Sequence, residues 1–235
     1  FKQTTQLKQT TQQKSPVSLF LRLSIKATTP EQLSLLKSGQ LAFIPEPTYG
    51  TQLQTFAYPG GRAEGKLSVS YTPLNIVLPD ESVTLYQPSY SVSQLGYGPM
   101  HDEVLFSPRL TPPMIGLGLL EAIDDQSISA LADPDDRNQD GISGKLNQVW
   151  DAENQKIAIG RFGWKASKKN LAQQNAAALN GDLGISSTIS PNPAGDCTPK
   201  QIACYEQRHG SSDIHDGLEA SQTMTDLLLY FTRYI

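Results

Sequence analysis

The sequence predicts a loop-rich α+β fold made of modest helices with an inserted β-hairpin. Three observations carry this prediction: 16 prolines and 18 glycines among 235 residues, helical periodicity with capping residues in separate segments, and one long stretch of alternating apolar and polar side chains. At this length, a hydrophobic share of 38% is enough to bury a core of ordinary size without help from a cofactor.

The first sixteen residues are expected to form a polar linker or arm, and residues 17–235 a single loop-rich domain. The arm contains the string Lys-Gln-Thr-Thr-Gln twice, starting at Lys2 and at Lys8, and has almost no apolar content. Such a segment buries too little apolar surface to offset the entropy that it would lose on folding.

Residues 17–25 and 66–94 are expected to be extended. In the first segment Arg22 alternates with apolar neighbours, so it should lie on the polar side of a strand. In the second, two alternating segments flank a turn at residues 79–82, which predicts a β-hairpin. Pro73 and Pro88 favour sheet edges, because proline donates no hydrogen bond to a neighbouring strand.

A first helix is predicted after Thr29, which stands at the N-cap position and is followed by Pro30 and Gln32 in the first turn. Gly39 supplies its end. Residues 116–131 and 170–179 are two further plausible helices.

The clearest helix is the last one. We expect Asp216 and Glu219 to form a capping box ahead of it. Its apolar face is then made of Met224, Leu227, Leu228, Phe231 and Ile235. Because neither Gly nor Pro ends this helix, we expect the natural protein to continue past Ile235.

The charge balance indicates no nucleic-acid partner and no anionic membrane surface. Nineteen basic side chains stand against 23 acidic ones, which leaves a net charge of −4 and no basic footprint. No apolar run is long enough for a membrane span, and the polar start is unlike a signal peptide, so any export signal is expected to have been removed.

An acidic loop is the sharpest local signal. Asp136, Asn138 and Asp140 offer side-chain oxygens at every second position, Gly141 allows a sharp turn and Ile142 offers its carbonyl. The pattern departs from an EF-hand, because Asn147 stands where that loop has a bidentate Glu. The alternative is a solvated acidic turn. We expect a structural calcium site formed by Asp133, Asp135, Asp136, Asn138, Asp140 and Ile142.

The histidines and cysteines give no catalytic set. His209 and His215 are not spaced for one helical face, and no nucleophile elbow is present, which disfavours a cofactor-free hydrolase. Cys197 and Cys204 lie in a Pro- and Gly-rich loop, where they form either a small disulfide ring or two free thiols.

Seven stretches, taken in order, resemble one known family. They are residues 21–24, 49–54, 64–65, 107–123, 132–136, 140–144 and 160–166. The sequence resembles the di-haem c-type oxidoreductases, a peroxidase-like family related to the bacterial di-haem cytochrome c peroxidases. Members carry a Cys-x-x-Cys-His haem-attachment motif on either side of such a region, and this chain contains none.

The resemblance implies cytochrome-c-like helices, haem c in the full-length protein and a periplasmic location. It also implies a small oxidant such as peroxide and an electron-donor protein as partners. Because the periplasm is oxidising, the resemblance favours a disulfide between Cys197 and Cys204.

The same resemblance suggests residues that face a haem. Tyr49 and Gln52 fall in a stretch similar to the distal pocket, where they would contact haem or position peroxide. Arg109 and Glu121 would form a buried pair, or Arg109 would contact a haem propionate. Arg22 and Trp164 are the remaining expected cofactor contacts. The alternative is a calcium-stabilised exported binding or scaffold module without redox activity, and the flanking coding sequence distinguishes the two.

Overall fold

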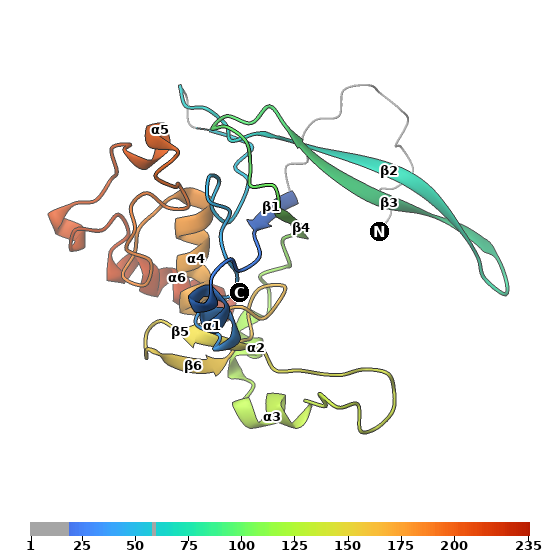
Figure 1. The fold of residues 1–235 in the computed structure, drawn as a ribbon. Helices are drawn as coiled ribbons and strands as arrows, with labels where there is room; N and C mark the ends of the chain where they lie inside the picture. The colour runs from blue at the N-terminus through green and yellow to red at the C-terminus, as the bar shows by residue number, and fades with distance from the viewer. Residues whose placement is uncertain (1–18, 58–59) are drawn as a thin grey trace.

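The computed structural model describes residues 19–57 and 60–235. Helices and small antiparallel sheets alternate along the chain and are joined by long loops, which confirms the predicted α+β class (Figure 1). The predicted arm at residues 1–16 and the first two residues of the expected strand at 17–25 lie outside the described residues.

The described strands form three separate two-stranded antiparallel sheets. The pairs are β1 (Leu19–Ser24) with β4 (Leu105–Leu110), β2 (Lys66–Val77) with β3 (Ser82–Ser93), and β5 (Gln148–Asp151) with β6 (Lys156–Ile159). Because β1 pairs with a strand that starts about 80 residues later, this small sheet brings distant parts of the chain together.

The hairpin β2–β3 confirms the sequence prediction and projects far from the body of the molecule (Figure 1). Its register runs from Lys66 opposite Ser93 to Val77 opposite Ser82. Only the base is buried, through Leu67 and Val69, whereas most residues further out are exposed.

The main core lies where β1 meets the base of the hairpin. Leu21 and Leu23 alternate along β1 on its buried side, and they pack with Tyr49, Leu53 and Leu67. A period of two in the sequence therefore selects one face of β1 for the core.

The described helices are short. They are α1 (Pro30–Lys37), α2 (Leu117–Ala122), α3 (Asp125–Ala130), α4 (Leu171–Leu183), α5 (Ile202–Tyr205), the 3-10 helix η1 (Asp213–His215) and α6 (Gln222–Tyr234). In α1 the hydroxyl of Thr29 accepts the amide of Gln32 at 3.2 Å, so the predicted cap is confirmed.

The segment 116–131 forms two helices rather than one. Ile123 is extended, and the carboxylate of Asp124 then caps α3 by accepting the amide of Ser127 at 2.8 Å. An internal residue that competes for backbone donors in this way ends one helix and begins the next.

The start of the last helix was predicted wrongly. Ser221 is the N-cap of α6, and its hydroxyl accepts the amide of Met224 at 3.3 Å. Asp216 instead follows η1 with a φ of 56°. The carboxylate of Glu219 accepts the amides of Ser186 and Gly210, both at 2.8 Å, so a tertiary contact takes the group that the capping box would have used.

Candidate functional site

The loop 46–54, which carries Tyr49 and Gln52, is held by three carboxylates that accept its backbone amides. The first is Glu46, which is almost fully buried. It accepts the amides of Thr48 at 2.7 Å, Tyr49 at 2.6 Å and His101 at 2.7 Å. These bonds join the loop to the segment that precedes β4.

The second carboxylate is Asp196, which reaches the loop from the C-terminal half of the chain. It accepts the amides of Thr51 and Gln52 at 2.9 Å each and the hydroxyl of Thr51 at 3.0 Å. Burial raises the pKa of Asp196 to about 6, and its bonds to the loop together with the charge of Arg22 limit that rise. Gly50 has a φ of 70°, and a Cβ there would lie 2.9 Å from an Asp196 carboxylate oxygen, so the close approach requires glycine.

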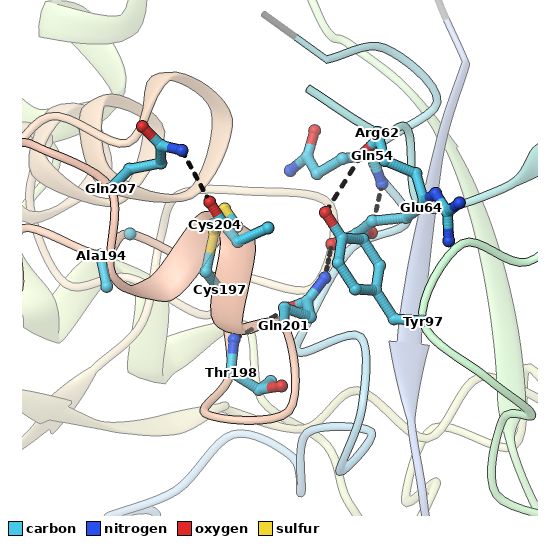
Figure 2. Close-up of a disulfide and its surroundings, with 12 residues drawn as sticks. Gln54, Arg62, Glu64, Tyr97, Ala194, Cys197, Thr198, Gln201, Cys204 and Gln207 are labelled. Carbon is cyan, nitrogen blue, oxygen red and sulfur yellow. Dashed lines mark hydrogen bonds between the residues drawn. A yellow bond between two sulfur atoms is a disulfide. The ribbon is translucent and has the colours of Figure 1, made fainter. Parts of the chain in front are cut away.

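The third carboxylate is Glu64, whose side chain binds both the loop and the region of Cys197 and Cys204 (Figure 2). It accepts the amide of Gln54 at 2.6 Å and the side-chain amide of Gln201. Burial raises the pKa of Glu64 to about 7, and the charges of Asp196 and Glu46 add to this rise.

Tyr49 and Gln52 occupy different environments. Tyr49 is fully buried; its hydroxyl donates to the carbonyl of Gly98 at 2.6 Å and accepts the amide of Tyr97 at 3.1 Å. Burial raises the pKa of Tyr49. The side-chain amide of Gln52 donates to Asp182 at 3.0 Å, while its carbonyl oxygen is buried and has no hydrogen-bond partner among the described residues. Tyr49 thus binds the main chain, and Gln52 keeps one unused acceptor.

Arg22 faces this loop from β1, as its place on the polar side of the strand predicts. Its guanidinium donates to the hydroxyl of Thr51 at 3.4 Å. Burial, and then the charge of Arg22, lower the pKa of Lys168. The charge of Arg22 therefore acts on both Asp196 and Lys168.

Arg109 and Trp164, predicted as separate haem contacts, line one open pocket. We call it the Arg109–Trp164 pocket; its volume is about 540 Å³. The indole N–H of Trp164 donates to the carbonyl of Leu110, and Nε of Arg109 donates to the hydroxyl of Ser107 at 3.0 Å. The full lining is Leu19, Val69, Tyr71, Tyr90, Pro108, Arg109, Leu110, Trp164 and Lys165.

Glu121 does not lie in this pocket, and it does not pair with Arg109. Its carboxylate accepts the amide of Leu171 at 2.8 Å and pairs with Arg233 of α6. These two bonds tie α2 to the start of α4 and to the end of α6. The structure therefore places Glu121 in the helix packing.

Sequence reasoning missed Arg161. Its guanidinium donates to the carbonyls of Leu120, Glu121 and Ile123 at the end of α2, and it pairs with Asp125. The only sequence signal is its position in the stretch 160–166, one of the seven that carry the family resemblance. The structure shows that this stretch packs against the end of the stretch 107–123.

The predicted calcium ligands bond to their own loop. The carboxylate of Asp133 accepts the amide of Arg137 at 2.9 Å, and that of Asp140 accepts the amide of Ile142 at 2.8 Å. Asp136 accepts the amide of Gly141 at 3.2 Å. In the part of the chain that the structure describes, no group of three or more His, Cys, Asp or Glu side chains is arranged to hold a metal ion. Calcium therefore stays a prediction.

The two cysteines are joined in the structure. Cys197 and Cys204 form a disulfide with a Cα–Cα distance of 6.0 Å, as the resemblance favoured. None of the helices that the structure describes combines the length and the apolarity needed to cross a membrane.

Comparison with known proteins identifies a family for this chain. The model of the family described as "di-haem oxidoreductase, putative peroxidase" matches residues 80–235, which is well over half of the chain. No curated protein and no solved structure matches the chain significantly. The matched residues include Arg109 and Trp164 of the pocket and every element from β4 to α6. The chain belongs to the di-haem oxidoreductase family.

Proposed function

We propose that this chain forms the region between the two haem-attachment motifs of a periplasmic oxidoreductase that passes electrons to a small oxidant such as peroxide. Two facts support the proposal: the family carries two haems, and the 235 residues contain no Cys-x-x-Cys-His motif. The haem iron supplies the electron-transfer chemistry when it is bound. The role of this chain is to bind and orient it.

The Arg109–Trp164 pocket is the observation that carries the proposal. Tyr71, Tyr90 and Trp164 give it aromatic walls, and Arg109 and Lys165 add two cations to its lining. A haem edge has a matching character, because the porphyrin is apolar and its propionates are carboxylates. The residues present therefore fit the group.

Arg109 is suited to bind a carboxylate. Only its Nε is engaged, by Ser107 at 3.0 Å, and its terminal amino groups have no hydrogen-bond partner among the described residues. A guanidinium binds a carboxylate through two parallel hydrogen bonds, which fixes orientation as well as position. Trp164 is anchored by its N–H to Leu110, so its ring forms a fixed wall.

The first experiment records the visible spectrum of the full-length protein produced in cells that attach c-type haem. We expect a Soret band that shifts when peroxide is added. A colourless full-length product would rule out the redox function.

The second experiment tests the pocket by redox titration of the same protein. We expect Arg109→Ala to lower the midpoint potential of one haem, because removal of a nearby positive charge disfavours the reduced form electrostatically. Arg109→Lys should lower this potential less than Arg109→Ala does. The control is Arg137→Ala, which removes an exposed cation from the loop 133–144. If Arg109→Ala and Arg137→Ala give equal potentials, the pocket does not contact haem.

Calcium is the remaining part of the proposal, with a structural role in the loop 133–144. We expect calcium to raise the melting temperature of the wild-type protein and to have no such effect on Asp140→Ala, since Asp140 is a predicted ligand. Magnesium is the control ion. An equal response of both proteins would place the calcium elsewhere.

A further inference from the structure

The disulfide closes a small ring that supports the loop 46–54. Between Cys197 and Cys204 the only regular structure is the start of the single-turn helix α5. A helix this short is not stable by itself in water, so the covalent link adds to hydrogen bonds inside the ring, such as that from the amide of Gln201 to the carbonyl of Thr198 at 2.9 Å.

The ring presents its donors to the other half of the chain. The hydroxyl of Thr198 donates to the carbonyl of Thr48 at 2.7 Å, and the side-chain amide of Gln201 donates to Glu64. Asp196, which directly precedes the ring, accepts the amides of Thr51 and Gln52. These partners are more than 130 residues apart in sequence.

Gln201 is oriented from inside the ring. Its side-chain oxygen accepts the amide of Thr198 at 2.8 Å, which turns its nitrogen towards Glu64 (Figure 2). Gln201 is fully buried and Glu64 is 6% exposed. The bond between them therefore depends on the backbone at Thr198, which directly follows Cys197 of the disulfide.

A second pocket is formed by the segments that flank the ring, and neither cysteine lines it. It has a volume of about 690 Å³, and its walls come from residues 192–194 and 205–209, which lie on the two sides of the ring in sequence. The two cysteines are themselves partly exposed.

We propose that the Cys197–Cys204 disulfide is a thiol-exchange site, and that its reduction by a dithiol releases the loop 46–54. A thiolate of the dithiol attacks one sulfur, the Cys197–Cys204 bond breaks, and the second thiol of the partner resolves the mixed disulfide. The dithiol loses two electrons and two protons and becomes a disulfide, while each cysteine sulfur gains one electron and one proton. The inference goes beyond the proposed haem function and does not depend on it.

The consequence is a change in how Tyr49 and Gln52 are held. In the oxidised protein the ring contacts supplement those of Glu46. In the reduced protein the donors of Thr198 and Gln201 are no longer fixed, so Glu64 loses one of its two hydrogen bonds.

The test is amide hydrogen exchange of the full-length protein before and after treatment with dithiothreitol, with alkylation and mass measurement to count free thiols. We expect peptides covering residues 46–54 and 62–66 to exchange roughly tenfold faster after reduction, as expected for the loss of one hydrogen bond to a charged group. Peptides from α4 should not change.

Two variants keep the test decisive. The double variant Cys197→Ser, Cys204→Ser should show the fast exchange without any reductant. If it does not fold, Gln201→Ala keeps the disulfide and should still speed exchange at residues 62–66. The proposal is overturned if alkylation shows complete reduction with unchanged exchange, or if the disulfide is reduced only when α4 also unfolds.

Discussion

Gly118 of α2 lies directly against the main-chain carbonyl of Arg233 in α6. A Cβ at position 118 would overlap this carbonyl group and come within 3.0 Å of the Cα of Arg233. The two helices therefore touch backbone to backbone, and this contact needs a residue without a side chain. The side chain of Arg233 then pairs with Glu121, one turn further along α2.

Replacement of Gly118 by Ala should lower the free energy of unfolding by about 2 kcal/mol, because the helices must move apart to admit the methyl group. The matched control is Gly181→Ala in α4, where nothing lies within 4 Å of the new Cβ. That change should raise stability by about 0.5–1 kcal/mol, since Ala favours a helix over Gly. Urea unfolding of both variants checks the prediction, and effects of the same sign would contradict it.

Arg161 should be among the most sensitive arginines to substitution. Its side chain is only 9% exposed, and it donates to three carbonyls at the end of α2. Arg161→Ala should lower the free energy of unfolding by roughly 3 kcal/mol, because Asp125 and the helix end lose a cation that is largely shielded from water. Arg161→Lys should recover little, since an ammonium cannot reproduce the planar fork.

The control for Arg161 is Arg137→Ala. The side chain of Arg137 is 81% exposed and contacts Asp135 at 3.7 Å. Its removal should change stability by no more than about 0.5 kcal/mol. Thermal or urea unfolding of both variants provides the comparison, and similar losses would mean that Arg161 does not support α2.

The sequence correctly predicted the elements whose stability depends on contacts between residues close together in the chain. Thr29 caps α1 through a residue three positions away, and the hairpin at 66–93 follows from alternation and one turn. The prediction failed at Glu219, because its carboxylate bonds to Ser186, which is 33 residues away. No sequence pattern around Glu219 reveals that Ser186 binds its carboxylate.

The candidate site shows the same division. The family resemblance suggested that Arg109 and Trp164 contact a haem, but their shared pocket depends on the pairing of β1 with β4 and on a loop some 50 residues later. The buried carboxylate Glu64 was missed as a functional residue. The sequence singles out Glu64 only as part of the stretch 64–65, and its 6% exposure and its bond from Gln201, which is 137 residues away, appear only in the fold.

The corrected start of α6 can be tested by removing its cap. Ser221→Ala should lower the free energy of unfolding by about 1 kcal/mol, because the amide of Met224 loses its acceptor. Thr223→Ala, at an exposed position in the first turn, should be neutral or slightly stabilising. Equal effects in urea unfolding would show that Ser221 is not the functional cap.

Glu64 should make stability depend on pH in a window that its pKa defines. In the folded protein the pKa is about 7, against an ordinary value of 4.5, because burial penalises the charged form. The folded state therefore holds its proton more tightly. The stabilising contribution is complete below pH 4.5 and is lost as the pH rises to about 7. The total loss is roughly 3 kcal/mol at about 1.4 kcal/mol per pKa unit.

The measurement is the difference in unfolding free energy between wild type and Glu64→Gln at about pH 5, 6, 7 and 8. The difference is used because the contribution of every group that titrates equally in both proteins cancels. Asp196 contributes with the same sign, but its pKa is about 6, so its effect ends earlier. The free energy of unfolding of the variant should rise relative to that of the wild type as the pH increases to about 7. This holds even though Gln can accept from only one of Gln54 and Gln201. A constant difference across this range would mean that Glu64 titrates normally and that its surroundings are wetter than the buried contacts indicate.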